Sequence, residues 1–401
     1  MRLNGAPNQR LDGAPSAFFE APRLAVTRLI LTNFRSYLST SLEASGRPVV
    51  LAGPNGAGKT NILDALSLLS PGRGLRGATL GEHTRRGPSA PSEALWAVAG
   101  TVSRSGNAYE IGTGLTLGPN GGERRRVHLN GAPSNNAADL ADVVQMAWLT
   151  PAMDRLFIEG TSGRRKFLDR LVFGFTPEHA RNAARYEIAM RERARLLKYG
   201  PRDPAWLDGL EAEMTEAGIA VATARAEGIE RLNKALGARG EAGAFPSAHL
   251  TLVGEADTLI AESVDIAPEY RNRFARARIR DAEAGRTTFG PHRSDLAVRH
   301  VQKRTDAAEC STGEQKALLI AIVLAHAWES SHMRDGRAPI LLLDEVAAHL
   351  DSKRRAALFE EILALGAQAW MTGTDIEMFA PLKTKADLFA VAESTPALIS
   401  E

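Results

Sequence analysis

Residues GPNGAGKT, at 53–60, have the composition and spacing of a loop that binds a triphosphate. Its glycines let successive backbone N–H groups turn toward one anion, and a following helix adds the positive end of its dipole. Lys59 would reach the β- and γ-phosphates of ATP, and the Thr60 hydroxyl would ligate Mg²⁺. An apolar run precedes the loop and helical spacing follows it, which is the expected strand–loop–helix context. The predicted ATP contacts are Gly53, Pro54, Asn55, Gly56, Ala57, Gly58, Lys59, Thr60 and Asn61.

A second segment, PILLLDE at 339–345, supplies carboxylates. Four apolar residues, Ile340 to Leu343, predict a central parallel strand that is buried on both faces. Ligands of open α/β sheets bind beyond the carboxyl ends of such strands. Asp344 would hold Mg²⁺ through water, and Glu345 would be the base that polarises an attacking water. Alone this pattern would indicate only a cap, but beside the loop at 53–60 it predicts ATP hydrolysis.

A third segment, STGEQ at 311–315, opens a long apolar helix that continues to Ala327. A serine hydroxyl and the free N–H groups at a helix start form a second anion site. The alternative is an ordinary cap, with Glu314 in the first turn of the helix.

These three segments, in this order, resemble the ABC ATPase family, whose signature LSGGQ corresponds to CSTGEQ here. The resemblance implies that the signature of one subunit closes over ATP held by the other, through Ser311, Thr312, Gly313, Glu314 and Gln315.

The same resemblance assigns three further positions. Gln145 would be the catalytic glutamine that contacts Mg²⁺ and water. Asp351 would lie in the loop that crosses the dimer interface. The switch position, which is histidine in the family, is Thr374 here. That departure leaves open how fast this chain hydrolyses ATP.

Two long charged segments on either side of GPRDP (200–204) predict a pair of antiparallel helices. A narrow apolar stripe on the second segment favours a slender two-helix arm over a helix in a thick core. The stripe consists of Trp206, Leu210, Met214, Ala217 and Val221.

The expected fold is α/β: a P-loop ATPase head with a mixed sheet, an antiparallel β-subdomain and an inserted helical arm. A flexible extension would occupy 1–22, and the first half of the head 23–160. The helical arm would occupy 161–285, and the second half of the head 286–401.

Five segments together resemble the RecF family of recombination-repair ATPases, in the SMC-like branch of the ABC ATPases. They are LTNFRSY (31–37), QMAWLTPAMDRLF (145–157), GRRKFLDRLVF (163–173), TTFGPHRSDL (287–296) and STGEQKALLIAIVLAHA (311–327). The resemblance covers about 23–380. It implies an ATP-dependent homodimer that binds duplex DNA near single-strand gaps, hydrolyses ATP slowly, and helps RecR and RecO to load RecA. Arg35 and Ser36 would lie near the adenine or the phosphates.

Basic residues are clustered at several places. We expect DNA contacts from Arg124, Arg125, Arg126, Arg164, Arg165 and Lys166, and a predicted helix at 268–283 is also rich in arginine. Such residues would hold backbone phosphates and carry little sequence information. The alternative is that they form solvated faces balanced by nearby acids. Few aromatic residues lie among them, which argues against a stacking platform for single strands.

Composition excludes several classes. The formal charge of +2 neither requires nor excludes nucleic acid, and the single cysteine, Cys310, excludes a disulfide within the chain. No stretch reaches the roughly 18 apolar residues of a membrane span, and no signal peptide is evident, so we expect a cytoplasmic protein without a membrane partner.

Some alternatives stay open at this point. The loop, strand and signature also occur in the ATP-binding subunits of membrane transporters, although the helical hairpin argues against that class. A nucleotide-gated scaffold without significant turnover is compatible with Thr374. His292 and Arg293 would either touch the nucleotide or brace the root of the arm.

Overall fold

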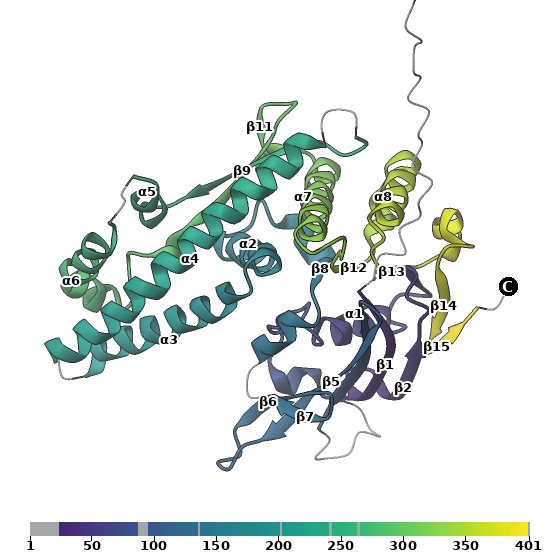
Figure 1. Cartoon of the computed structure of the whole chain (residues 1–401), viewed down its shortest axis with the longest axis horizontal. Helices are drawn as coiled ribbons and strands as arrows, with labels where there is room; N and C mark the ends of the chain where they lie inside the picture. The colour runs from purple at the N-terminus through teal and green to yellow at the C-terminus, as the bar shows by residue number, and fades with distance from the viewer. Residues whose placement is uncertain are drawn as a thin grey trace, which may run out of the picture.

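The computed structural model describes residues 24–86, 95–134, 137–200, 203–239, 243–262 and 265–399. The predicted extension at 1–22 lies outside these residues. An α/β body carries a helical arm that projects to one side (Figure 1). None of the helices in the described part is long and apolar enough to cross a membrane.

A six-stranded sheet forms the centre of the body, with the order β15-β14-β3-β13-β12-β8. Every neighbouring pair is parallel except β14 and β15. Because the four residues of β12 are all buried, the predicted central strand is confirmed. The strands are β3 (Val49–Ala52), β8 (Met146–Leu149), β12 (Ile340–Leu343), β13 (Ala369–Gly373), β14 (Asp387–Ala392) and β15 (Thr395–Leu398). The helices α1 (Lys59–Ser67), α7 (Thr312–His332) and α8 (Ser352–Leu365) belong to the same body.

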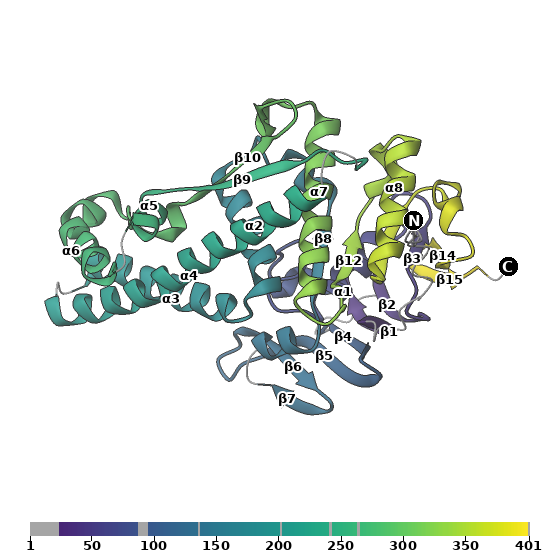
Figure 2. The same cartoon turned by 45° about the horizontal axis from the view of Figure 1, so that its top comes forward.

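An antiparallel sheet with the order β2-β1-β4-β5-β6-β7 lies beside the first (Figure 2). Its strands are β1 (Ala25–Phe34), β2 (Tyr37–Glu43), β4 (Ala97–Arg104), β5 (Asn107–Leu117), β6 (Glu123–Leu129) and β7 (Ala132–Ser134). Gln368, which is fully buried, joins the two sheets: its amide accepts from Val26 N at 2.8 Å and donates to Val26 O at 3.0 Å. The two sheets and the helices between them share one hydrophobic core.

Short 3₁₀ helices connect these elements. They are η1 (Leu80–His83), η2 (Ala137–Asp142), η3 (Pro151–Arg155), η4 (Pro291–Arg293), η5 (Ala307–Glu309), η6 (Val346–His349) and η7 (Ile376–Leu382).

The arm contains the predicted pair of helices, α3 (Glu178–Tyr199) and α4 (Pro204–Ala238), which lie side by side along its length (Figures 1 and 2). The Asp203 carboxylate caps α4 by accepting from Ala205 N at 2.9 Å. The helices α2 (Thr161–Phe175), α5 (Glu255–Glu262) and α6 (Ala267–Ala284) accompany the pair. A three-stranded sheet connects arm and body; it consists of β9 (Ala248–Val253), β10 (Asp295–His300) and β11 (Thr305–Asp306).

The expected slender two-helix arm is wrong, because α6 packs on both long helices and the arm has its own core. That core contains Tyr186, Met214, Tyr270, Phe274 and Phe289. The remaining half of α4 packs on α7 and β9 of the body. Four residues of the predicted stripe are buried or half-buried, but Trp206, near the start of α4, is 53% exposed.

A buried ion network holds α3, α4 and α6 together. The Arg193 side chain has no exposed surface, and its Nε and Nη1 contact Glu211 Oε1 at 2.8 Å and Asp281 Oδ2 at 2.7 Å. Its Nη2 donates to Phe274 O at 2.8 Å. Both carboxylates are almost fully buried, and Arg278 Nη2 also contacts Glu211 Oε2 at 2.6 Å, so two cations balance the two buried acids.

We predict that Arg193→Met lowers the free energy of unfolding by about 3–5 kcal/mol, because it leaves the buried Asp281 carboxylate without its cation and Glu211 with Arg278 alone. Urea unfolding measures the change. Arg191→Met is the matched control, since Arg191 lies on the exposed face of the same helix and, among the residues that the structure describes, donates to Glu187 O alone. Equal unfolding midpoints for the two variants would contradict a structural role for the network.

Candidate nucleotide-binding site

The predicted phosphate loop lies between β3 and α1. Neighbouring atoms leave no room for a side chain at two of its glycines. A Cβ on Gly53 would lie 2.1 Å from Val391 O in β14, which is impossible without moving that strand. Gly58 has a φ of 105°, and a Cβ there would lie 2.7 Å from Tyr37 Oη. Gly56 also has a positive φ, of 81°, but faces open space. The backbone of the loop therefore curls in a conformation that side chains at these positions would prevent.

Lys59 lies over the inner side of this loop. It is only 4% exposed, and its Nζ donates to Gly53 O at 2.7 Å and to Pro54 O at 2.8 Å. Burial lowers the pKa of Lys59, and the nearby charges of Glu345 and Asp344 partly offset that effect. The ammonium group is thus held by two neutral carbonyls in the centre of a loop shaped for an anion.

Asp344 follows β12 and is shared by two hydroxyl groups from different elements. Its Oδ1 accepts from Thr60 Oγ1 at 3.0 Å and from Thr372 Oγ1 at 2.7 Å. Burial raises the pKa of Asp344, while the two hydroxyl donors lower it. A buried carboxylate oxygen beside a threonine hydroxyl is a donor set that suits Mg²⁺, so the residues fit the ion that the sequence implies.

Glu345, the predicted base, has a strained backbone. Its φ of 49° and ψ of 25° place a non-glycine residue in the left-handed region. The Glu345 N–H donates to Thr372 Oγ1 at 2.8 Å. Strain of this kind persists where neighbours fix the backbone, and it is common at functional sites.

Thr372 is a site residue that the sequence did not reveal. It is fully buried and bonds both Asp344 and the backbone of Glu345. The predicted switch residue, Thr374, is exposed beyond the end of β13. The pairing of β12 with β13 sets Leu343 beside Met371, so the next residue of each strand meets at the site. The register between β12 and β13 places Thr372, and not Thr374, beside Asp344. This register cannot be read from the sequence.

Gln145 is not brought to this site. It precedes β8, and its carbonyl accepts from Ile340 N at the beginning of β12, whereas Asp344 follows the end of β12. The four residues of β12 separate the two edges by about 13 Å. The expected contact of Gln145 with Mg²⁺ and water is therefore wrong for this geometry.

The turn that contains Arg35 and Ser36 packs against the loop. The Arg35 guanidinium contacts the buried Asp64 carboxylate, with Nε at 3.0 Å and Nη2 at 2.9 Å, so it faces α1 and not an open nucleotide pocket. Burial raises the pKa of Asp64, but His83 and Arg35 outweigh it and hold the pKa below its usual value. Ser36 Oγ accepts from Asn61 Nδ2 at 2.9 Å, which places Ser36 beside the loop.

The signature segment begins α7 on an exposed edge. Ser311 N and Oγ both donate to Glu314 Oε2 at 3.0 Å, so the cap predicted as the alternative is present. The contacts of Glu314 with Lys303 and Ser311 lower its pKa to about 2. Thr312 and Gly313 are exposed, and Gln315 is buried and donates to Cys310 O at 2.8 Å. Among the described residues, no hydrogen bond or ion pair joins this segment to the phosphate loop of the same chain.

Two other predicted positions have structural roles. Asp351 caps α8, since its Oδ1 accepts from Arg354 N at 2.8 Å. His292 Nε2 donates to Thr287 O at 2.9 Å, and its Nδ1 accepts from Tyr186 Oη at 2.8 Å. Burial lowers the pKa of His292 to about 4, so the ring is neutral at pH 7. These contacts favour the brace at the root of the arm for His292, while Arg293 is exposed.

Three of the six predicted DNA-contacting side chains already form hydrogen bonds or ion pairs with other groups of the protein. Arg125 donates to Thr113 Oγ1 at 2.8 Å and to main-chain oxygens of Leu68 and Gly72. Arg164 forms a bidentate pair with Asp295, at 2.8 and 2.9 Å. Arg165 donates to Thr161 Oγ1 and to Ser294 O, both at 2.8 Å. The remaining three, Arg124, Arg126 and Lys166, are exposed.

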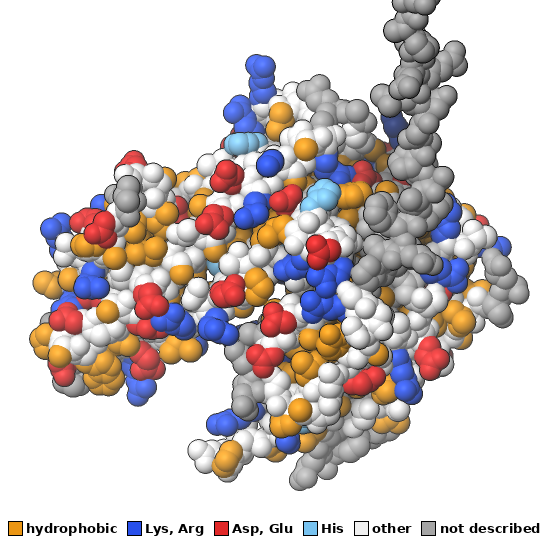
Figure 3. Space-filling model, in the orientation of Figure 1, with side chains coloured by type: hydrophobic (Ala, Val, Ile, Leu, Met, Phe, Trp, Pro, Cys, Tyr) orange, Lys and Arg blue, Asp and Glu red, His pale blue; other side chains and the backbone are white. Residues whose placement is uncertain are grey.

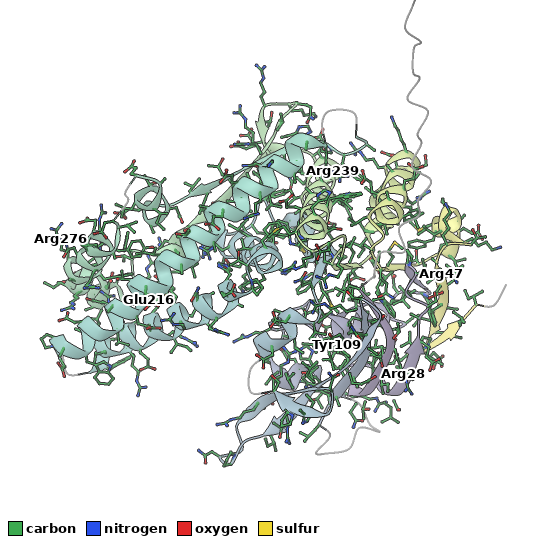
Figure 4. The ribbon with its side chains drawn as sticks, viewed as in Figure 1. Arg28, Arg47, Tyr109, Glu216, Arg239 and Arg276 are labelled. Atoms are coloured by element: carbon green, nitrogen blue, oxygen red, sulfur yellow. The ribbon has the colours of Figure 1, made fainter. Side chains whose placement is uncertain are left out.

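The arginine-rich helix predicted at 268–283 is α6. There Arg273 and Arg278 pair with acids, whereas Arg271, Arg276 and Arg280 are exposed. Arg276 is labelled in Figure 4. Acidic and basic side chains are interspersed on the visible face of the arm (Figure 3). Much of the positive charge on α6 thus lies on solvated faces balanced by nearby acids, which was the predicted alternative to DNA contacts.

Comparison with known sequences gives a consistent result. Residues 25–395 match the family described as RecF/RecN/SMC N terminal domain. The chain is 49% identical over 372 residues to the DNA replication and repair protein RecF of Rhizobium etli (strain CIAT 652), covering 92% of this chain and 98% of the relative. It is also 49% identical over 371 residues to the protein of the same name from Agrobacterium fabrum (strain C58 / ATCC 33970), covering 92% and 97%.

Solved structures agree on the fold. The chain resembles the recombination mediator protein RecF-ATP of the RecFOR pathway with a TM-score of 0.77 and 22% identity, over 94% of this chain and 98% of the other. It resembles the Smc head domain from Pyrococcus furiosus with a TM-score of 0.51 and 16% identity, over 94% and 96%. The predicted α/β head with an antiparallel sheet and a helical insertion is confirmed.

We predict that Thr372→Val lowers the free energy of unfolding by about 1–3 kcal/mol, because Asp344 and Glu345 N–H each lose a buried partner. Thr372→Ser should keep most of the stability. Thr374→Val is the control, since an exposed side chain should change stability by no more than about 0.5 kcal/mol.

The effect of Thr372→Val should also depend on pH. The folded pKa of Asp344 already lies above its ordinary 3.8, so folded stability declines as pH rises through that pKa. Without the Thr372 donor the pKa rises further, and the loss should therefore be larger at about pH 7 than at about pH 4. Urea unfolding at both pH values measures it; equal losses for Thr372→Val and Thr374→Val would show that the shared hydroxyl is unimportant.

Proposed function

Because the chain belongs to the RecF proteins of the RecF/RecN/SMC N terminal domain family, we propose that it is an ATP-dependent DNA-binding protein of recombinational repair. The observation that carries this proposal is the convergence of the phosphate loop, Lys59, Thr60 and Asp344 at one edge of the parallel sheet. The 49% identical relatives are DNA replication and repair proteins, so the transporter alternative is wrong.

ATP binds with its β- and γ-phosphates in the loop at 53–60, and the Lys59 ammonium exchanges the Gly53 and Pro54 carbonyls for phosphate oxygens. Anionic oxygens are stronger partners for an ammonium than neutral carbonyls, which favours the exchange. Thr60 and Asp344 would hold Mg²⁺, which would supply positive charge where charge develops on the transferred phosphoryl group.

Glu345 accepts a proton from the water that attacks the γ-phosphorus, and ADP and phosphate are the products. Thr372 acts as a positioning residue, because it fixes the Asp344 carboxylate and the strained backbone of Glu345 together. Turnover is slow and is stimulated by DNA. A scaffold without significant turnover stays the alternative, since the switch position carries no histidine.

ATP also joins two copies of the chain. The exposed start of α7, at Ser311, Thr312 and Gly313, meets the triphosphate held by the second copy, with Asp351 near the interface. Support comes from the exposure of this segment and from its separation from the phosphate loop of its own chain. A helix start with free N–H groups is suited to an anion.

Duplex DNA near single-strand gaps binds to the closed dimer through backbone phosphates. The exposed Arg124, Arg126 and Lys166 are the candidate contacts that the internal pairing leaves free. Binding led by phosphates weakens as salt rises. RecR, RecO and RecA are the proposed partners, in the cytoplasm. The proposal keeps the division into head halves at 23–160 and 286–401 and an arm at 161–285.

We predict that Glu345→Gln binds ATP and accumulates as a dimer, because the nucleotide stays unhydrolysed between the two copies. Lys59→Ala should lose ATP binding and stay monomeric. Light scattering with ATP, with ADP and without nucleotide measures the mass, and a steady-state ATPase assay with and without gapped DNA separates the enzyme from the scaffold. A Glu345→Gln variant that stays monomeric in saturating ATP would count decisively against the dimer mechanism.

A further inference from the structure

A cavity of about 160 Å³ lies at the edge of the parallel sheet opposite to Asp344, where the chain enters β8. Three arginines line it: Arg104 at the end of β4, and Arg334 and Arg337 after α7. Asp142 is the only carboxylate among the described residues of the lining. A group of basic side chains is visible just below α7 in Figure 3. Positive charge therefore exceeds negative charge around this cavity.

The protein holds these three guanidinium groups mainly through neutral oxygens. Arg104 donates to Asp142 O, Arg334 donates to Gly174 O at 2.5 Å, and the Arg337 Nε donates to Arg334 O at 3.0 Å. A carbonyl orients a guanidinium but does not neutralise it. Within the described part of the chain, the one ion pair that these three groups make is between Arg337 and Asp335, at 3.8 Å, and Asp335 is 97% exposed. Burial, then Arg337 and Arg104, lower the pKa of Arg334, as expected when like charges face one cavity.

A smaller cavity of about 40 Å³ adjoins the first and shares Ala141, Gln145 and Pro177 with it. Arg170 lines it, with its guanidinium carbon 3.9 Å from the centre of the Trp148 ring. Arg170 Nη1 is buried and has no hydrogen-bond partner among the described residues. Burial lowers the pKa of Arg170 to about 9, so the group is still charged at pH 7.

An unpaired buried guanidinium is costly, and proteins normally give such a group a carboxylate. Arg193 in the arm follows that rule with two acids. A role in offsetting the dipole of α7 would explain Arg334 and Arg337, which follow its carboxyl end. It does not explain Arg104 in the antiparallel sheet or Arg170 in α2.

We infer that the two adjoining cavities form a binding site for a phosphate-bearing anion, separate from the ATP site. Guanidinium groups match phosphate oxygens through paired N–H donors, and four of them, from β4, α2 and the segment after α7, line the two cavities. The phosphate belongs either to a free oligophosphate or to the DNA backbone, since both present the same oxygens. The inference stands on these contacts and does not depend on the proposed ATP hydrolysis.

The test uses inorganic pyrophosphate as the probe, with every variant made in a Lys59→Ala background so that the phosphate loop is impaired. Pyrophosphate should raise the unfolding temperature of Lys59→Ala. Adding Arg170→Met and Arg334→Gln together should weaken its apparent affinity by on the order of tenfold or more. Adding Arg191→Gln, which changes an exposed arginine of α3, should leave it unchanged. No stabilisation of Lys59→Ala, or stabilisation that survives the loss of both arginines, overturns the site.

A second measurement separates a ligand site from a packing role. Arg170→Met alone, without any ligand, should unfold at or above the wild-type temperature, because an unpaired buried charge is removed. A lower unfolding temperature together with an unchanged response to pyrophosphate would mean that Arg170 serves packing only, and the inference would fail.

Titration with gapped DNA in the presence of ATP, with Lys59 left intact in every variant, identifies the source of the phosphate. If the DNA backbone is the ligand, the Arg170→Met/Arg334→Gln pair should weaken DNA binding and reduce its dependence on salt. If a free oligophosphate is the ligand, DNA binding should match that of Arg191→Gln while the pyrophosphate response is lost.

Discussion

The Asp344 carboxylate, shared by the hydroxyls of Thr60 and Thr372, is the contact on which the arrangement of the site depends. It joins three segments that are far apart in the sequence: the first turn of α1, the end of β12 and the end of β13. Because these strands are parallel, their carboxyl ends meet at one edge, and the phosphate loop after β3 reaches the same edge. A buried acid satisfied by two donors also fixes the geometry of Glu345, whose backbone N–H depends on the same threonine.

Arginine side chains in the arm and at the edge of the parallel sheet differ in whether acids balance their charge. In the arm, Arg193 is fully buried but balanced by Glu211 and Asp281, and this network determines how three helices pack. At the edge of the sheet opposite the site, the half-buried Arg170 lies over Trp148, and its buried Nη1 has no hydrogen-bond partner among the described residues. Arg193 therefore stabilises the fold, whereas we infer that Arg170 is available to a ligand. The sequence alone does not distinguish these two arginines.

The sequence predicts those features that depend on local pattern. The glycine loop, the apolar strand at 340–343 and the helical pair on either side of GPRDP are found where their spacing places them. Features that depend on tertiary register were not predictable. Thr372 rather than Thr374 meets Asp344 because of how β13 pairs with β12, and Gln145 lies at the wrong end of β8. Likewise, charge in the sequence did not distinguish Arg125, which donates inward, from its exposed neighbours.

We propose that ATP and Mg²⁺ replace contacts that the protein makes with itself at this edge. A crystal structure with a non-hydrolysable ATP analogue and Mg²⁺ would show whether they do. We expect Lys59 Nζ to leave the Gly53 and Pro54 carbonyls for phosphate oxygens, and Thr60 to turn from Asp344 toward the ion. A nucleotide bound elsewhere, with Lys59 still 2.7 Å from Gly53 O and Thr60 still on Asp344, would contradict it.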